Sequence, residues 1–304
     1  MESLKTLVLI VYTMVCLDMS WGRSNSGCIE RSLVGENRLI IPNSSYTASS
    51  FLYDSRQLRD RVTGKLYWDK RYVSHGAKLY SPFGWSPRDN NNPEDYLQLD
   101  LGAVRAIIAV AIQGNGKRRS YEWIKTFKLR FKQDTNSTKW IDYGDILQNC
   151  YTCDKNSYWD RGCWCTNKDK TRETANIVVR HELNKTHAAR YIRFVPVKYH
   201  TCKTMRVNVY FVNQEAPRVN ATPSERSIFV RWTIQPCGKL THLITGYLVH
   251  VSTKGKFNVS STTTSKNITG LQPYTEYKIR VKAVPYGLWS DNKTIQTDIA
   301  GLLT

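Results

Sequence analysis

The sequence predicts an all-β protein with two domains, and three observations lead to this fold class. The 304 residues allow about two domains of roughly 100–200 residues each. Beyond the N-terminal segment, short runs with strand character alternate with turn signals, and no long segment repeats its apolar residues with the helical period. The pattern breaks at Asn213–Pro217, which we take as the boundary between the domains.

The predicted strands follow from local patterns. In Tyr96–Leu101, three leucines alternate with polar residues, as in a strand with one buried face. Ile107–Ile112 is apolar throughout, as in a strand buried on both faces. The spacing of about ten to twenty residues between the later strands is typical of a β-sandwich. The remaining predicted strands are Phe127–Lys132, Tyr191–Val195 and Val207–Phe211 before the break, and Ser227–Trp232, Tyr247–Ser252, Tyr277–Val284 and Lys293–Thr297 after it.

Residues 1–22 have the layout of a secretory signal peptide. Lys5 precedes the apolar run Thr6–Leu17, and Ser20 and Gly22 place small residues at the −3 and −1 positions of a cleavage site before Arg23. The run is too short to cross a bilayer core of about 30 Å as a helix, and no later apolar run of about 20 residues follows. We therefore expect a secreted, extracellular protein without a transmembrane segment in this chain, or a cell-surface one if the sequence is a truncated receptor.

The glycosylation sequons agree with export of the protein. Export would place the cysteines in an oxidising compartment. Seven of the eight cysteines remain once residues 1–22 are removed, so at least one stays free or pairs between chains. The asparagines of the seven Asn-x-Ser/Thr glycosylation sequons are Asn43, Asn136, Asn184, Asn220, Asn258, Asn267 and Asn292.

The positive charge predicts an anionic partner. The chain carries 44 Lys and Arg against 25 Asp and Glu, a net charge of +19. Residues 22–211 hold 32 basic and 18 acidic side chains (+14), residues 212–304 hold 11 and 5 (+6), and the leader contributes −1. A basic excess does not identify its anion, but export argues against nucleic acid and leaves glycans and lipid headgroups.

Four cysteines lie close together in the sequence. Cys150, Cys153, Cys163 and Cys165 could bind zinc, form two disulfides or provide a redox Cys-x-x-Cys. The oxidising compartment favours disulfides, and we expect them to link the two clusters because a bridge between Cys163 and Cys165 would be strained. We interpret residues 149–167 as an insertion held by these bridges. Cys237 stands alone and is either a buried free thiol or part of an intermolecular bridge.

No catalytic constellation is visible in the sequence. The six histidines are scattered, and neither a Gly-Lys-Ser/Thr phosphate loop nor a Gly-x-Ser-x-Gly elbow occurs. The glycine-rich stretch Gly114–Lys117 lacks the following Ser or Thr and predicts a turn between strands. We therefore expect a binding protein and not an enzyme, with no assigned cofactor or metal ligand.

Residues 28–211 carry a collinear series of motifs. They are TASS at 47–50, GWSP at 84–87, DYLQLDLG at 95–102, IQG at 112–114, YEWIKTFKLRF at 121–131, ARYIRFVP at 189–196 and MRVNVYF at 205–211. This series resembles the discoidin family, which includes the C domains of coagulation factors V and VIII, neuropilins and discoidin-domain receptors. The resemblance implies an eight-stranded, jelly-roll-like β-barrel whose loops at one end commonly hold the ligand.

Residues 216–297 resemble a fibronectin type III domain, and 298–304 form a short tail. RSIFVRW at 226–232 supplies the buried Trp232 of an early strand, and LQPYTEYKIRVKAV at 271–284 supplies Tyr277. The resemblance implies that the Tyr277 ring is buried and that its hydroxyl bonds nearby backbone.

Two further expectations concern the discoidin-like part. We expect a bridge between Cys28 and Cys202 to join the ends of the first domain and to stabilise it by about 4–5 kcal/mol. Here the sequence departs from the family, because many members place the last cysteine just after a final Leu-x-Gly, where this chain has Phe211 and Val212. Some discoidin relatives also hold a structural Ca²⁺ through backbone carbonyls and Asp, but such ligands leave no sequence trace, and no residue is assigned.

Two loops are the candidate ligand site. Both carry Arg or Lys beside aromatic rings, a combination that suits anionic sugars, since rings stack on sugar faces and Arg forks bind carboxylate, sulfate or phosphate. The alternative is that the rings pack under their own loop and the charges are only solvated. The candidate residues are Tyr53, Arg56, Arg59, Tyr67, Trp68 and Arg71 in the first loop, and Lys117, Arg118, Arg119 and Tyr121 in the second.

Three functional hypotheses remain open. The first is an adhesion or recognition protein that binds anionic glycans, or other carbohydrate, of the cell surface or matrix through these loops. The second is binding to an anionic phospholipid surface through apolar residues of the first loop. The third is the ectodomain, or soluble form, of an adhesion receptor that binds an extracellular protein, with Lys278, Arg280 and Lys282 as a basic row on the second domain.

Overall fold

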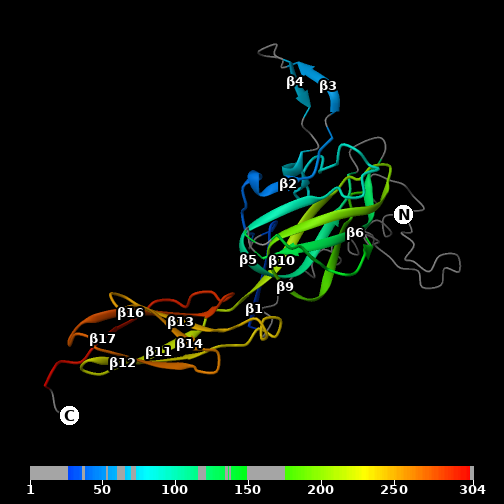
Figure 1. Cartoon of the computed structure of the whole chain (residues 1–304). Coiled ribbons are helices and arrows are strands. Elements are labelled where there is room, and N and C mark those ends of the chain that lie inside the picture. Colours follow the sequence, from blue (N-terminus) through cyan, green and yellow to red (C-terminus); the bar gives the residue numbers. More distant parts are fainter. Residues whose placement is uncertain are drawn as a thin grey trace, which may run out of the picture. The chain divides into compact units, whose positions relative to one another are not determined.

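A computed structural model describes residues 27–301, apart from 36–37, 53, 60–65, 70–72, 116–120, 134–135, 137 and 149–174; for 54–59 and 66–69 it describes the backbone. The chain forms two compact units. The large unit is Ile29–Asn213; the small unit starts at Gln214 and also includes Gly27 and Cys28. Strands dominate both units, which confirms the predicted all-β class (Figure 1).

An eight-stranded sheet builds the large unit. Its hydrogen-bonded order is β1-β10-β5-β9-β6-β7, with β2 on β5 and β8 on β6, and in the described part this order does not close on itself. A separate hairpin of β3 and β4 stands away from this sheet (Figure 1). The elements are β1 (Cys28–Ser32), η1 (Asn43–Ser45), β2 (Tyr46–Ala48), β3 (Asp54–Arg59), β4 (Leu66–Asp69), η2 (Ser74–Ala77), β5 (Leu97–Gln113), β6 (Trp123–Lys132), β7 (Ile141–Asp142), β8 (Leu147–Gln148), β9 (Val178–His200) and β10 (Arg206–Gln214).

Two strands are longer than the sequence predicts. β5 joins two predicted strands, because Gly102 adopts a φ of 74° and a register shift between Asp100 and Arg105 lets the chain continue in the sheet. β9 begins at Val178, well before the predicted Tyr191. Ile107 of β5 pairs with His187 and Ala109 of β5 pairs with Glu182, so β9 has extra residues at this point and forms a bulge. The polar residues of this bulge hide the two-residue period that marks a strand.

Apolar side chains from every long strand fill the core of the large unit. Trp85 lies in this core, fully buried, although it belongs to a loop. Burying a side chain of this size stabilises the fold by roughly 3 kcal/mol. The predicted alternation in β5 is confirmed, because Leu97, Leu99 and Leu101 are all fully buried while Gln98 and Asp100 are not.

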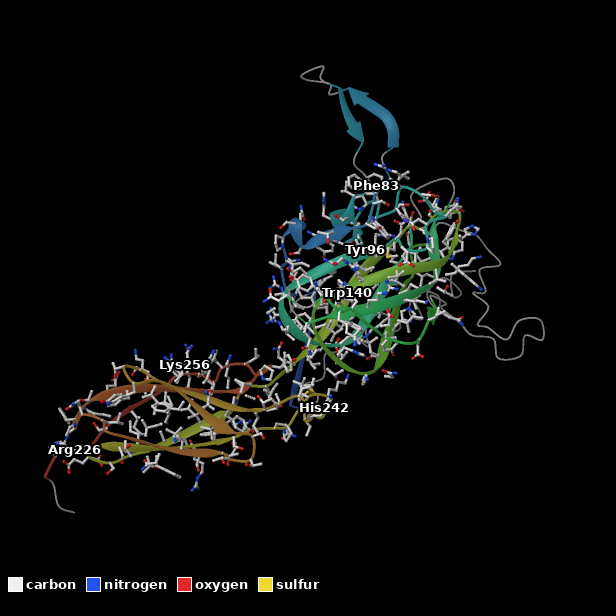
Figure 2. The ribbon with its side chains drawn as sticks, in the orientation of Figure 1. Phe83, Tyr96, Trp140, Arg226, His242 and Lys256 are labelled. Atoms are coloured by element: carbon white, nitrogen blue, oxygen red, sulfur yellow. A yellow bond between two sulfur atoms is a disulfide. The ribbon has the colours of Figure 1, made fainter. Side chains whose placement is uncertain are left out.

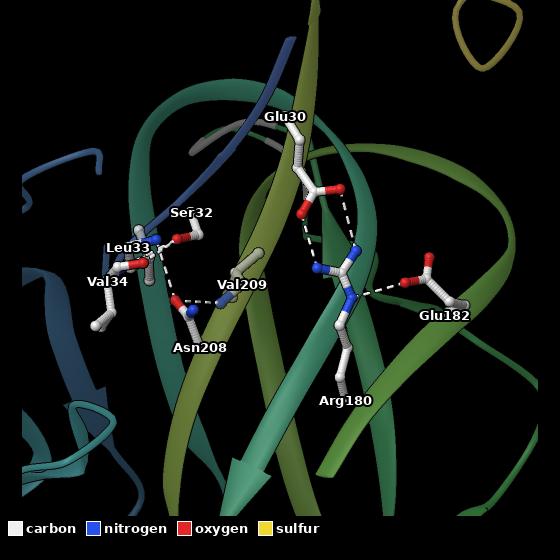
Figure 3. A network of polar contacts seen from close by, with 8 residues as sticks. All are labelled: Glu30, Ser32, Leu33, Val34, Arg180, Glu182, Asn208 and Val209. Carbon is white, nitrogen blue, oxygen red and sulfur yellow. Dashed lines mark hydrogen bonds and ion pairs between the residues drawn. The ribbon is translucent and has the colours of Figure 1, made fainter. Parts of the chain in front are cut away.

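A polar network pins the edge strand β1 (Figure 3). Both guanidinium nitrogens Nη1 and Nη2 of Arg180 donate to the Glu30 carboxylate, at 2.7 and 3.1 Å, and Nε donates to Glu182 at 2.7 Å. Burial alone would lower the pKa of Arg180, but the hydrogen bonds of the two carboxylates outweigh it and raise that pKa. Arg180 also lies over the Tyr210 ring of β10. These contacts tie β1 to β9 across the two strands between them.

The small unit is a pair of sheets, as the strand spacing predicts. Trp232 and Tyr277 are buried in its core, and the Tyr277 hydroxyl accepts a hydrogen bond from the backbone N–H of Gln272 at 3.0 Å, which confirms both predictions for these residues. One sheet has the order β11 (Arg218–Pro223), β12 (Ser227–Thr233), β15 (Ser265–Thr269); the other has the order β14 (Gly255–Ser260), β13 (Gly246–Val251), β16 (Glu276–Val284), β17 (Lys293–Gln296).

The disulfide joins Cys28 to Cys237, with their Cα atoms 4.7 Å apart. The predicted bridge between Cys28 and Cys202 is therefore wrong, and Cys237 is neither a free thiol nor an intermolecular partner. Hydrogen bonds explain the pairing, because the Gln214 side chain donates to the Gly27 carbonyl and accepts from the Cys237 N–H. Cys202 lies before the start of β10, whereas Gln214 is the last residue of that strand. The nine residues of β10 extend about 30 Å, so Cys202 lies at the far end of the strand from the residue that holds Gly27 and Cys237.

Two predictions fall outside the described residues, namely the signal peptide at residues 1–22 and the disulfides of the four clustered cysteines. Cys150, Cys153, Cys163 and Cys165 lie in 149–174, so their pairing stays a prediction. None of the helices in the described part is long and apolar enough to cross a membrane.

Candidate functional site

The first candidate loop rises from a platform of three motifs. The Asp95 carboxylate accepts hydrogen bonds from the hydroxyls of Ser49 and Ser50, at 2.7 and 3.0 Å. The Trp85 indole N–H donates to the Ser50 carbonyl at 2.8 Å, and the Leu52 N–H donates to the Ser86 carbonyl at 2.8 Å. Because Asp95 and Trp85 are buried, these bonds hold the chain rigidly where the first loop begins.

The second candidate loop is a connection between bridged residues. Asn115 and Glu122 exchange backbone hydrogen bonds, so residues 116–120 between them link the end of β5 to the start of β6. A Cβ atom at Gly114 would lie 2.5 Å from the Glu122 carbonyl oxygen and 2.5 Å from the Trp123 Cβ. Glycine is therefore required where this loop begins.

Arg206 connects the roots of both loops. Its guanidinium is buried and donates to the carbonyl of Gly114, to the carbonyl of Ser81 at 2.9 Å and to the Asn176 side chain at 2.6 Å. Burial lowers the pKa of Arg206 to about 10, so this side chain remains a cation at neutral pH. Because Ser81 leads to Trp85 and the platform of the first loop, both loops start from the same end of the large unit.

A second buried pair supports this end. The Thr204 hydroxyl donates to the Glu122 carboxylate at 2.7 Å, and both residues are buried. Thr204 lies in the turn between β9 and β10, and Arg206 is the first residue of β10. The sequence predicts only a strand at 207–211, so the buried polar role of Thr204 and Arg206 was missed. The sole signal is a charged residue inside the apolar motif MRVNVYF.

A buried lysine ammonium bonds the backbone of the loop that precedes Asp95. Lys203 is 2% exposed, and its Nζ donates to the Asn92 carbonyl. Burial lowers the pKa of Lys203, and the negative charges of Asp95 and Asp89 partly offset this. Within the described ranges, no group of three or more His, Cys, Asp or Glu could hold a metal ion.

The predicted loop residues are described only in part. Tyr53, Arg71, Lys117, Arg118 and Arg119 lie outside the described residues. Tyr121 is half-buried at the end of the second loop, with a φ of 37°. The backbone of the other four forms the hairpin, with Arg56 and Arg59 on β3 and Tyr67 and Trp68 on β4, and Tyr67 pairs with Leu58.

The asparagines of all seven sequons are exposed. Three lie in the large unit, and Asn184 stands in the bulge of β9. In the small unit, Asn220 and Asn267 flank β12 on one sheet, and Asn258 lies on β14 of the other. Exposure of the side-chain amide is the condition for glycan attachment, and every predicted position meets it.

Comparisons with known proteins identify both units. The F5/8 type C domain model matches residues 47–209, and the fibronectin type III domain model matches residues 215–296. Human contactin-associated protein 1 is 33% identical over 123 residues, and the mouse protein is 32% identical. The match covers 40% of this chain and 7% of each relative, so this chain spans a small part of their length.

Two solved structures are also similar to parts of the chain. The FN5 domain of Drosophila Lar is 32% identical, with coverage of 28% of this chain and 97% of that chain and a TM-score of 0.22. Discoidin II of Dictyostelium discoideum is 12% identical, with coverage of 80% and 90% and a TM-score of 0.40. Because the F5/8 type C model alone covers more than half of the sequence, the chain belongs to the F5/8 type C, or discoidin, domain family, and a fibronectin type III domain follows in the same chain.

Proposed function

We propose that this chain is an extracellular adhesion or recognition protein whose large unit binds an anionic glycan through its two candidate loops. Discoidin and fibronectin type III domains are adhesion and binding modules, not enzyme families, and contactin-associated protein 1 shares part of the sequence. The signal peptide predicted at 1–22 and the exposed asparagines of the seven sequons support an extracellular, glycosylated protein, either secreted or at the cell surface.

The observation that carries the proposal is the buried polar scaffold under the loops. Arg206 bonds the start of the second loop and Ser81, which follows the end of the first loop, and Asp95 and Trp85 fix the first loop where it begins. A rigid scaffold of this kind lowers the entropy that a loop loses when it binds a ligand. The +14 charge of residues 22–211 favours an anionic one.

Binding of heparin by the full chain tests this proposal. We expect Arg118→Ala/Arg119→Ala to weaken binding by about tenfold or more, because the loss of even one charge-assisted hydrogen bond costs roughly 1.5 kcal/mol. Lys125→Ala/Lys128→Ala removes the same charge from exposed positions on β6 and is the matched control. Equal affinity of the two double variants would contradict the loop site. Vesicles with and without phosphatidylserine test the phospholipid alternative in the same way.

A protein partner is the second candidate. The relative named for its association with contactin favours it, since that name records binding to another protein. Binding that survives enzymatic removal of cell-surface glycans but is lost after protease treatment of the cells would support this candidate over the glycan.

A further inference from the structure

One sheet face of the small unit gathers positive charge that the candidate loops do not explain. Along β16, Lys278, Arg280 and Lys282 alternate with the buried residues Ile279 and Val281, so all three point to the outer face. Across the sheet, Arg280 pairs with His250 of β13, and His250 pairs with Lys256 of β14. We call the set Lys256, His250, Lys278, Arg280, Lys282 and Trp289 the basic face.

The register brings these side chains close together. Strands in a sheet lie about 5 Å apart, and alternate residues along one strand about 7 Å apart. Lys256, His250 and Arg280 therefore form a row across three strands that crosses the row along β16 at Arg280. Figure 2 shows Lys256 at the outer surface of the small unit, where this row ends.

Trp289 orders the middle of the basic face. The Arg280 guanidinium lies 4.5 Å and the Lys282 ammonium 5.1 Å from the Trp289 ring centroid. The ring is held in place because Ser290 exchanges backbone and side-chain hydrogen bonds with Val281 of β16, at 2.8 and 2.9 Å. Cation–π contacts of this kind fix long side chains before a ligand arrives, which reduces the entropy that binding costs.

The charge on this face is not neutralised. Among the described residues, none of Lys256, Lys278, Arg280 and Lys282 forms an ion pair. Glu276 is the carboxylate on the same side of β16, and it lies at the end of the row opposite Gln296. Cations placed together on a solvent-facing sheet create a positive potential that attracts anions.

We infer that the basic face binds a sulfated glycan chain, as a second site separate from the candidate loops. A linear polyanion fits two crossing rows of cations, and the Arg280 fork matches a sulfate or carboxylate group. Insertion into a lipid surface would need exposed apolar side chains. Among the described residues of the small unit, the large apolar side chains that are exposed are Phe229, Tyr274 and Ile299, and none belongs to β13, β14, β16 or β17.

The test uses the full chain and a heparin-derived octasaccharide. Lys278→Gln/Lys282→Gln removes two charges and leaves Arg280 on Trp289. Arg231→Gln/Lys266→Gln removes two charges from exposed positions of the opposite sheet and is the control. Each pair is made both in the natural sequence and in the Arg118→Ala/Arg119→Ala background, in one expression host so that glycans at Asn258 and Asn292 are the same.

In the Arg118→Ala/Arg119→Ala background we expect Lys278→Gln/Lys282→Gln to weaken octasaccharide binding about tenfold, while the control changes it less than twofold. In the natural sequence the loop site remains, so the same change should lower the number of octasaccharides bound per chain from two to one. Circular dichroism and thermal unfolding should stay unchanged. Equal affinity of the two variants in the Arg118→Ala/Arg119→Ala background would overturn the inference. Vesicle binding that is lost with Lys278→Gln/Lys282→Gln while octasaccharide binding is kept would also overturn it. If the loop variant changes nothing but Lys278→Gln/Lys282→Gln weakens binding, the loop proposal fails and the basic face stands.

Discussion

The Cys28–Cys237 disulfide should contribute a large share of the free energy of unfolding of this chain. Replacing both cysteines, as Cys28→Ala/Cys237→Ala, removes a link between residues 209 positions apart. On the chain-entropy model a loop of that length restricts the unfolded chain by about 18 cal/mol/K, which corresponds to about 5 kcal/mol at 25 °C. This value applies when both units unfold together.

The disulfide contributes a smaller free energy when only the small unit unfolds. β1 and β10 are neighbours in the sheet of the large unit, so the ends of that unit stay together while it is folded. The bridge then closes only the segment from Gln214 to Cys237, about 24 residues. The same model gives about 3.5 kcal/mol for a loop of that size. The loss should therefore appear first in the transition of the small unit.

Urea unfolding followed by tryptophan fluorescence measures this loss, and peptide mapping by mass spectrometry identifies the linked pair. We expect Cys28→Ala and Cys237→Ala to lose the same free energy of unfolding as the double variant, because either change removes the one bridge. Additive losses of the two single variants, or a mapped link from Cys28 to Cys202, would refute the reasoning.

Three further predictions concern single side chains. Burial lowers the pKa of His181 to about 4 against 6.5 for an exposed histidine, so the folded state favours the neutral ring; the stabilisation is complete above pH 6.5 and falls as pH drops towards 4, by about 2 kcal/mol between pH 7 and 4.5 in urea titrations. Gly114→Ala should cost about 1–3 kcal/mol in urea unfolding, since the new Cβ meets Trp123. Tyr277→Phe should cost about 1 kcal/mol in thermal unfolding, because the Gln272 N–H loses its acceptor.

Each of these has a matched comparison. His181→Gln should remove part of the pH dependence, and an unchanged profile would contradict the role of His181. Gly144 has open space around its Cα in the structure, but its φ of 98° also favours glycine, so Gly144→Ala measures backbone strain without a steric clash. A loss at Gly114 no larger than at Gly144 would contradict the packing argument. Tyr247→Phe, in the same core as Tyr277, controls for removal of a hydroxyl elsewhere.

The sequence predicts much of the fold because the patterns involved are local. Alternation in Leu97–Leu101 reports a strand with one buried face, and the structure buries those leucines. The strands that prediction missed, such as β11, β14 and β15, are short and rich in polar residues, so they carry no clear period. Residues of the candidate loops were chosen by composition, and most of them lie outside the described part of the chain.

The sequence by itself determined the all-β class, the two units and the buried roles of Trp232 and Tyr277, because side-chain periodicity and turn signals act between neighbours in the chain. Only the tertiary structure decided the partner of Cys28, the burial of Arg206 under both loops and the gathering of Arg280 with Lys256. These depend on which strands become neighbours and in what register. Contacts between residues far apart in sequence are set by that register, and no local pattern records it.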